Sequence, residues 1–186
     1  MISYNKTLKQ RNKLLKNFAT TNNFDSFTLE TYDELLIKYG KIIFCEREKY
    51  LQKLIPVFQQ YYLEISGGDE EVGIEYKSQL SDNVFLDLLK KSLEIDKVSS
   101  RTNVGIHKDD LVFTLNNYPI KKHGSQGQQK SFLISLKLAQ FEFMKMELGL
   151  DPILLLDDIF DKLDDKRVES IVRLVSEHNF GQIFIT

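Results

Sequence analysis

Hydrophobic positions in the first third of the chain recur at the spacing of long helices. The pattern predicts one helix over residues 1–18, and in residues 28–65 an apolar side chain returns every seven residues, beginning with Leu29. At a helical rise of about 1.5 Å per residue, the second helix would be roughly 57 Å long. Pro56 is expected to kink or break it near its end. The two segments predict an antiparallel helical hairpin over residues 1–66.

Beyond the hairpin, strand and helix patterns alternate. The final order of helix, strand, helix and strand is typical of a mainly parallel sheet with flanking helices. We therefore predict an α/β fold in two parts, a mostly helical arm lobe at residues 1–100 and a domain that contains the parallel sheet at residues 101–186. The expected elements are a strand at 72–76, a helix at 82–96 with Ser81 as its N-cap, strands at 111–115 and 118–120, a loop at 121–124, a helix at 127–148, a strand at 153–157, a helix at 164–178 and a last strand near 183–186.

Composition and charge narrow the class of protein. The chain has 186 residues, of which 42% are hydrophobic and 28% are charged, as in soluble globular proteins. Its single cysteine, Cys45, cannot form an internal disulfide, and no apolar run approaches the roughly 20 residues that span a bilayer. We expect a cytoplasmic protein without a membrane segment. The net charge of −2 gives no overall attraction to nucleic acid, so any DNA contact would come from a local patch.

One local basic patch is expected on the first helix. Four lysines follow a spacing of three, four and three residues, which places them along one helix face, and no acidic residue precedes Asp25. Both a contact with DNA phosphates and an ordinary solvated helix face are consistent with this pattern. The candidate DNA-contacting residues are Lys6, Lys9, Lys13 and Lys16.

A small polar loop, residues 124–130, opens the long helix predicted from residue 127. Ser125 stands where an N-cap belongs, and Gly127 lacks a Cβ and so lets the backbone approach a ligand closely. The backbone N–H groups at such a helix end can bind an anion. A plain capped helix start is the alternative interpretation of the loop Gly-Ser-Gln-Gly-Gln-Gln-Lys.

Four apolar residues, 153–156, run directly into Asp157 and Asp158. The apolar run suits a strand buried on both faces, and its carboxyl end is where α/β sheets bind ligands. Adjacent strand residues point to opposite sides, so one carboxylate can reach a hydrated Mg²⁺ while the other orients a water molecule. A strand that simply enters an acidic loop is the alternative.

The order and spacing of the polar loop, the helix and the acid-tipped strand resemble ABC ATPases, with Leu163-Asp164 at the position of the D-loop. In more detail, the chain resembles the RecF family of DNA replication and repair proteins over essentially its whole length. Ile106 stands where the family has proline, and Lys108 and Lys130 stand where it has arginines. The matching stretches are Tyr4–Asn12, Gly105–Leu111, Ser125–Lys130 and Leu154–Asp158.

The resemblance implies that two heads sandwich two ATP molecules. Asp157 would hold Mg²⁺, and Asp158 would position or activate the attacking water. The D-loop, Leu163 and Asp164, would lie at the dimer interface. The signature loop would bind the ATP of the partner head, and His107 with Lys108 would contact nucleotide or support a loop. The signature-loop residues are Ser125, Gln126, Gly127 and Gln128.

A Walker A loop is missing from the sequence. The only Gly-Lys pair, Gly40-Lys41, is followed by Ile42, and Leu35 stands where the motif needs its first glycine. The chain also ends on the apolar run 182–186, which is typical of a buried strand. We therefore expect a C-terminal fragment that does not hydrolyse ATP by itself. The intact protein is expected to turn over slowly, since Asp158 is shorter than the glutamate of most ABC proteins.

For the intact protein, the resemblance implies a role in recombinational repair, replication-fork maintenance and the SOS response. It would form an ATP-dependent homodimer, bind DNA at single-strand/double-strand junctions, and assist recombinase loading with RecO- and RecR-like mediators. An SMC-like, chromosome-organising ATPase head is the alternative. A scaffold with decayed motifs is disfavoured because Ser125, Asp157 and Asp158 are all present.

Overall fold

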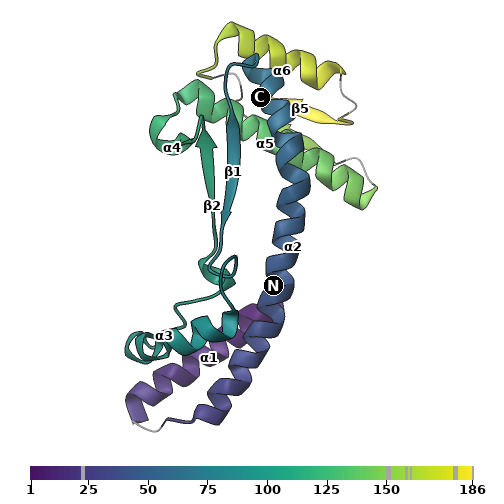
Figure 1. Cartoon of the computed structure of the whole chain (residues 1–186). Coiled ribbons are helices and arrows are strands. Elements are labelled where there is room, and N and C mark those ends of the chain that lie inside the picture. Colours follow the sequence, from purple (N-terminus) through teal and green to yellow (C-terminus); the bar gives the residue numbers. More distant parts are fainter. Residues whose placement is uncertain (22–23, 150–151, 158, 160, 178–179, 186) are drawn as a thin grey trace. The chain divides into compact units, whose positions relative to one another are not determined.

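The computed structural model describes residues 1–21, 24–149, 152–157, 159, 161–177 and 180–185. Helices dominate these residues, and the strands are short (Figure 1). The elements are α1 (Ile2–Thr21), α2 (Ser26–Ser66), β1 (Val72–Lys77), α3 (Phe85–Ser99), the 3-10 turn η1 (Ile106–Lys108), β2 (Asp110–Leu115), β3 (Tyr118–Pro119), α4 (Ile120–His123), α5 (Gln126–Leu148), β4 (Leu154–Leu156), α6 (Asp165–Glu177) and β5 (Ile183–Ile185).

The chain packs into two compact units, and each is assembled from two separate segments. The first unit combines Met1–Lys49 with Tyr76–Leu111, and the second combines Tyr50–Glu75 with Val112–Thr186. Helix α2 and strands β1 and β2 therefore contribute residues to both units. This division differs from the predicted boundary at residue 100, because a boundary in sequence cannot represent elements that are shared.

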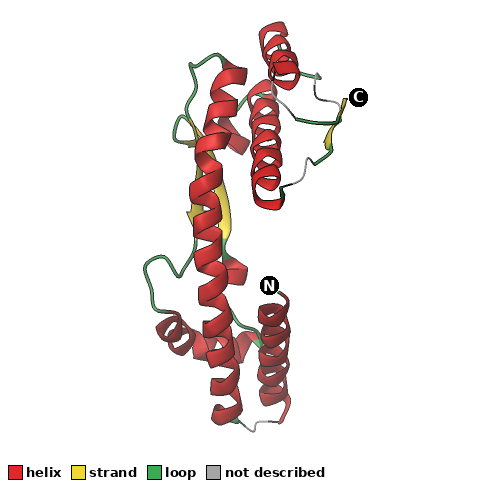
Figure 2. Ribbon diagram, turned by 90° about the vertical axis from the view of Figure 1, so that its right-hand side faces the viewer, coloured by secondary structure: helices red, strands yellow, loops and turns green. Residues whose placement is uncertain are grey.

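The first unit contains the predicted helical hairpin. Figure 2 shows α1 running alongside the first part of α2, and α3 packs on α1. Its apolar core has two groups of buried side chains. They are Tyr4, Leu36, Phe85, Leu89 and Ile106 in one group, and Leu15, Phe18 and Leu29 in the other.

A buried ionic network joins the helices of the first unit. The guanidinium of Arg11 is fully buried and donates through Nε to Asp33 (2.6 Å) and through Nη1 to Asp96 (2.7 Å). The same Nη1 donates to the Thr102 hydroxyl at 2.9 Å, and the second Asp96 oxygen accepts from the Asn103 backbone. A buried charge is tolerated only when it is paired in this way. Arg11 therefore lies on the buried face of α1, whereas the four lysines lie on its exposed face.

The start of α3 was predicted incorrectly. The helix begins at Phe85, three residues after the predicted start at residue 82, and its N-cap is Val84, which has no side-chain hydrogen bond to offer. Ser81, the expected cap, lies in the preceding turn and is exposed. The packing of Phe85 into the apolar core positions this helix end, which outweighs the preference of serine for the cap position.

Two further local features concern α2 and residues 121–124. Of the kink or break expected at Pro56, a break is excluded, because α2 continues to Ser66. Proline removes one helical hydrogen bond, but Leu54 and Phe58 on either side of it are buried and keep the helix packed. Residues 121–124, expected as a loop, mostly belong to the short helix α4 (Ile120–His123), which buries Ile120.

The second unit contains the strands that the alternating pattern predicted. Strands β4 and β5 are parallel, with Leu155 opposite Phe184 in the register. Strands β2 and β3 form the predicted antiparallel hairpin, and its turn residues Asn116 and Asn117 have φ of 48° and 64°, which suits a two-residue turn. The α/β fold with a parallel sheet is confirmed.

Burial of β4 corrects one prediction. Leu154 and Leu156 are buried, whereas Leu155 between them is 67% exposed. The strand therefore buries one face within this chain, not the two faces that its continuous apolar sequence suggested. The opposite face presents Leu155, and its neighbour Phe184 on β5 is 57% exposed.

Aromatic side chains form much of the remaining core of the second unit. Phe132 of α5 packs against Phe58 of α2, with 4.6 Å between ring centroids, and against Phe113 of β2. Farther along α5, Phe141 contacts Phe180. Aromatic pairs of this kind fix α5 firmly. Within the described ranges, no helix has the length and apolar character needed to cross a membrane.

Candidate functional site: a signature loop at the start of α5

The predicted anion-binding loop is a capped helix start. Ser125 is the N-cap of α5, and its hydroxyl oxygen accepts a hydrogen bond from the Gln128 backbone N–H at 3.2 Å. In return, the Gln128 Oε1 accepts from the Ser125 backbone N–H at 2.7 Å. This reciprocal pair is a capping box. The sequence predicted the cap by Ser125 but not the second hydrogen bond, which the Gln128 side chain accepts. Because Ser125 and Gln126 are exposed, the loop faces solvent in a fixed conformation.

The hydrogen bonds of the capping box give the four signature-loop residues two different roles. In an α-helix, the N–H groups of the first turn have no intrahelical acceptor, so those of Gln126 and Gly127 are available for an anion. The Ser125 hydroxyl can still donate its proton while it accepts from Gln128. Both ends of the Gln128 side chain are already bonded, to Ser125 and to Glu70. Gln128 therefore supports the loop, and Ser125, Gln126 and Gly127 form its ligand-facing part.

The D-loop lies against the signature loop within the same unit. A Cβ added at Gly127 would come within 3.1 Å of the Lys162 carbonyl oxygen, immediately before Leu163 and Asp164. Glycine fits this close approach, because a side chain would require the neighbouring backbone to shift by a few tenths of an ångström. The structure thus brings together two motifs that lie more than thirty residues apart in the sequence.

Asp164 forms the start of α6. Its Oδ1 accepts from the Arg167 backbone N–H at 3.0 Å, and its Oδ2 lies 3.2 Å from the Arg167 Nε. The backbone hydrogen bond from Arg167 lowers the pKa of the Asp164 carboxyl. Since its side chain is 61% exposed, Asp164 is also accessible from outside the unit. Its predicted place at a dimer interface stays a prediction.

A cluster of polar residues that the sequence analysis missed lies behind the loop. Glu70, between α2 and β1, accepts from the Gln128 Nε2 at 2.9 Å, from the Arg167 Nη2 at 2.7 Å, and from the Tyr62 hydroxyl. Arg167 also donates to the Ser131 hydroxyl at 3.0 Å. No local pattern marks these residues, because Glu70 and Arg167 are 97 positions apart.

The electrostatics of this cluster keep it ionised. Burial opposes the charge of Glu70, but hydrogen bonds from Gln128 and Tyr62 and the Arg167 guanidinium outweigh it and lower the carboxyl's pKa. Burial likewise opposes the charge of Arg167, and Tyr62 and Glu70 raise its pKa. Burial, together with the Glu70 carboxylate, raises the pKa of Tyr62, which stays a hydrogen-bond donor.

Asp157 lies at the carboxyl end of β4, as predicted, and is exposed. It borders a hollow of about 190 Å³ between β4 and α5, together with Lys130 and Lys137. Among the described residues, no group of three or more potential metal ligands occurs. One carboxylate still fits Mg²⁺, which commonly takes one or two protein carboxylates and fills its remaining positions with water and phosphate oxygens. Asp158 lies outside the described residues.

His107 belongs to the first unit, whereas the signature loop belongs to the second. Its Nε2 donates to the Thr102 carbonyl oxygen (3.1 Å), so its Nδ1 accepts from the Tyr4 hydroxyl (3.0 Å). Burial lowers the pKa of His107 and favours this neutral form. The geometry supports a loop-holding function, whereas nucleotide contact by His107 or Lys108 stays a prediction.

The residues next to His107 are also held by close packing and by hydrogen bonds within the first unit. Gly105 has φ of 118°, and a Cβ there would lie 2.6 Å from the Phe85 ring. Arg47 donates to Asp109 at 2.7 Å and to the Ile106 carbonyl oxygen at 2.8 Å. Arg47 therefore holds the residues after Gly105 in place. Glycine is favoured at position 105 because a Cβ would collide with the Phe85 ring.

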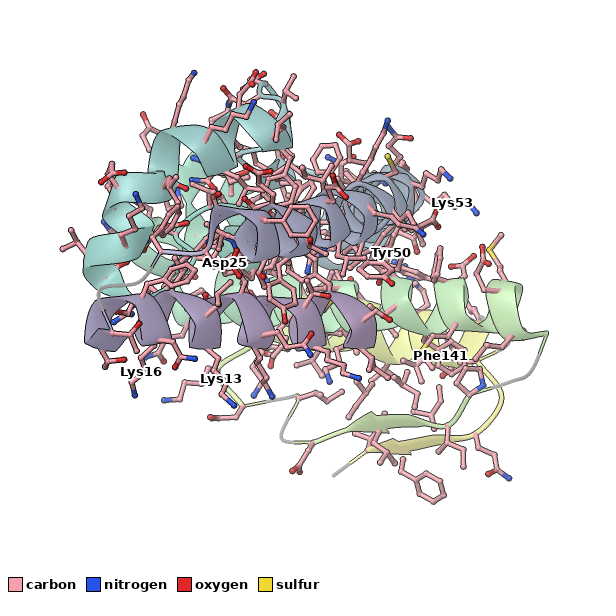
Figure 3. The ribbon with its side chains drawn as sticks, turned by 90° about the horizontal axis from the view of Figure 1, so that it is seen from below. Lys13, Lys16, Asp25, Tyr50, Lys53 and Phe141 are labelled. Carbon is pink, nitrogen blue, oxygen red and sulfur yellow. The ribbon has the colours of Figure 1, made fainter. Side chains whose placement is uncertain are left out.

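All four predicted DNA-contacting lysines are exposed on α1, opposite its buried face. Figure 3 shows the side chains of Lys13 and Lys16 pointing away from the rest of the first unit. The basic face predicted from sequence is therefore present and accessible. Whether it binds DNA stays a prediction.

A capped signature loop that touches a D-loop, next to a parallel strand with Asp157 at its tip, defines part of an ABC-type ATPase head, here with a helical arm lobe. The comparison with known proteins then gives the family. The chain is 50% identical over 186 residues to the DNA replication and repair protein RecF of Flavobacterium johnsoniae, covering 100% of the chain and 52% of that relative. The chain belongs to the RecF family.

Other comparisons agree. RecF of Cytophaga hutchinsonii is 48% identical, again over the whole chain and over 49% of its own length. A solved structure of the recombination mediator protein RecF-ATP in the RecFOR pathway matches with a TM-score of 0.84 and 33% identity, covering 100% of this chain and 51% of that one. No protein-family model matches the chain. The chain thus spans about half the length of the relatives that it matches.

Proposed function

We propose that this chain is part of a RecF-type ATPase that binds ATP and DNA in recombinational repair and at replication forks. The observation that carries the proposal is the close approach of Gly127 to the Lys162 carbonyl oxygen, immediately before the D-loop, beside a serine-capped, solvent-facing helix start. It is supported by relatives named as DNA replication and repair proteins and by a similar structure described as RecF-ATP. These names favour repair over a chromosome-organising SMC-like head.

In the proposed mechanism, the signature loop meets the γ-phosphate of ATP bound to a second copy. The backbone N–H groups of Gln126 and Gly127 and the hydroxyl proton of Ser125 are the donors, and the α5 dipole adds to their attraction for a phosphate. These donors are already oriented by the capping box, so little reorganisation is needed when the phosphate arrives.

Asp157 is proposed to help hold Mg²⁺, and Asp158 to position the attacking water. Mg²⁺, when bound with the nucleotide, neutralises charge on the phosphates. Since the sequence contains no Walker A loop, this chain by itself is not expected to hydrolyse ATP. A phosphate-binding loop would come from the part of the protein that corresponds to the other half of the relatives' length.

DNA binding is proposed for the exposed lysine face of α1. Lys6, Lys9, Lys13 and Lys16 would contact phosphates, which gives affinity without base specificity. A junction between single- and double-stranded DNA is the proposed target. RecO- and RecR-like mediators are the proposed partners in loading a recombinase, consistent with the RecFOR pathway of the similar structure.

The proposal is tested by measuring binding of a non-hydrolysable ATP analogue to the full-length protein, and then junction DNA binding with and without the analogue. We expect Mg²⁺-dependent analogue binding and tighter DNA binding in its presence. A Ser125→Arg variant should lose the nucleotide effect on DNA binding, because the side chain fills the space needed by the phosphate. Ser176→Arg, at an exposed position on α6, is the control. Absence of analogue binding by the wild-type protein would refute the proposal.

A further inference from the structure

Support for the signature loop extends beyond its own helix. The Gln128 side chain, which holds the Ser125 N–H at one end, is held at its other end by Glu70. Glu70 is only 14% exposed, and its second oxygen accepts from the buried Tyr62 on α2. The position of the loop therefore depends on a carboxylate that belongs to a different segment of the chain.

Arg167 extends the same support to the D-loop. Its three guanidinium nitrogens contact three different segments: Nη2 contacts Glu70, Nη1 contacts Ser131 in the second turn of α5, and Nε lies 3.2 Å from Asp164. The planar guanidinium can hold several acceptors in fixed directions at once, which a lysine ammonium cannot do. With 13% of its side chain exposed, Arg167 has little freedom to swing away.

From these contacts we propose that Glu70 and Arg167 are positioning residues for the nucleotide site. They hold the signature loop and the D-loop as one rigid piece, so that Ser125 and Gly127 meet the phosphate of the opposing copy at the same time as Asp164 reaches the interface. The inference rests on the proposed function. Neither residue contacts nucleotide itself, and both act through Gln128, Ser131 and Asp164.

A role limited to stability would give a different pattern of effects. Gly127 lies against the Lys162 carbonyl oxygen, so a small shift between α5 and α6 would open or close this contact directly. Loss of Arg167 should therefore loosen the loop locally, even where the unit stays folded. It should also weaken pairing of two copies through ATP without weakening the first binding of ATP, which uses other residues.

The first test is hydrogen exchange of the full-length protein without nucleotide. In Arg167→Ala and in Glu70→Gln, the hydrogen-bonded backbone amides of Ser125, Gln128 and Gln129 should exchange about tenfold faster, the factor expected when one charge-assisted hydrogen bond is removed. Arg173→Ala, an exposed arginine on the same helix, and Glu71→Gln, an exposed neighbour, are matched controls. Exchange in both variants equal to that of the controls would overturn the inference.

The second test measures ATP-dependent self-association by analytical ultracentrifugation. Arg167→Ala should weaken association about tenfold while the affinity for ATP stays unchanged. Arg167→Lys should give an intermediate loss, because lysine restores the charge but not the three-way contact. Complete rescue by lysine, or equal weakening by Arg173→Ala, would contradict positioning by the guanidinium.

Two outcomes separate this inference from the proposed function. If the wild-type protein neither binds ATP nor self-associates, the proposed function fails, and hydrogen exchange still decides whether Glu70 and Arg167 hold the loop. If the wild-type protein does both and the variants match their controls, the proposed function stands and the inference fails. Should Arg167→Ala not fold, as judged by circular dichroism, Glu70→Gln and Arg167→Lys provide the same readouts.

Discussion

The two units of the chain use charged residues in contrasting ways. In the first unit, Arg11 and Asp96 are both completely buried and are bonded to each other. In the second unit, the paired charges of Glu70 and Arg167 lie just beneath the surface, and the residues that they support, Ser125 and Gln126, face solvent. A charge network serves the fold alone in the first case, whereas in the second it presents a surface to a ligand. Substitutions should therefore affect stability most in the first unit and nucleotide-dependent behaviour most in the second.

The largest expected effect follows from breaking the buried network. Arg11→Ala leaves Asp96 and Asp33 without their cation, and should lower the free energy of unfolding by about 3–5 kcal/mol. Urea denaturation monitored by circular dichroism measures this change. Lys13→Ala, on the exposed face of the same helix, should change stability by less than about 0.5 kcal/mol. Equal effects of the two substitutions would remove the contrast between the units.

A smaller loss is expected at Gly105. Gly105→Ala places a Cβ 2.6 Å from the Phe85 ring and 2.8 Å from the Tyr4 hydroxyl at a positive φ, and should cost about 2–3 kcal/mol of unfolding free energy. Gly149 also has a positive φ, but nothing lies within 4 Å of an added Cβ. Gly149→Ala should therefore cost only about 1 kcal/mol. If both substitutions cost the same, neither the close packing of Gly105 nor its more strained backbone (φ 118°, ψ 179°) would contribute.

The pH dependence of the free energy of unfolding should reflect the protonation of His107. Burial lowers the pKa of His107 in the folded chain below its ordinary value of about 6.5, so the unfolded state binds a proton first. The stabilisation is complete above the ordinary pKa and is lost as the pH falls toward the folded pKa. The midpoint of urea unfolding should therefore decrease from pH 7 to pH 5. His107→Gln should flatten this part of the profile, and a substitution of the exposed His123 should not.

Substitutions of the exposed lysines on α1 should have the smallest effect on stability but a clear effect on DNA binding. Lys9→Gln combined with Lys13→Gln should leave unfolding unchanged and weaken DNA binding by the full-length protein. The dependence of log affinity on log salt should become shallower by about 0.9 for each DNA phosphate that the variant no longer neutralises. Lys38→Gln combined with Lys41→Gln, two exposed lysines on α2, is the control. An unchanged salt slope in the first double variant would assign DNA binding to another surface.

The sequence alone predicted those features that depend on residues close together in the chain. The helical hairpin follows from heptad spacing, the cap of α5 from Ser125, and the turn between β2 and β3 from the pair Asn116-Asn117. Each of these depends on a few neighbouring residues and on local backbone preferences. The parallel pairing of β4 and β5 was also predictable, because an intervening helix brings the second strand back in the same direction.

Features that depend on distant partners were not predictable. Glu70 lies in a short acidic turn segment, and nothing near it in sequence indicates that Arg167 and Gln128 will converge on it. The exposed face of Leu155 was missed because a continuous apolar run cannot tell how many layers cover a strand. Likewise, the start of α3 is set by packing of Phe85 and not by a polar cap.

The central claim, that the signature loop acts on the nucleotide of an opposing copy, is tested most directly by mixing two inactive full-length variants. Ser125→Arg disables the signature loop, and Asp157→Ala disables the Mg²⁺-binding strand. In a mixed pair, one site combines the intact strand of the first variant with the intact loop of the second. ATP hydrolysis should then return to roughly a quarter of the wild-type rate when copies pair at random. No recovery on mixing would contradict the account.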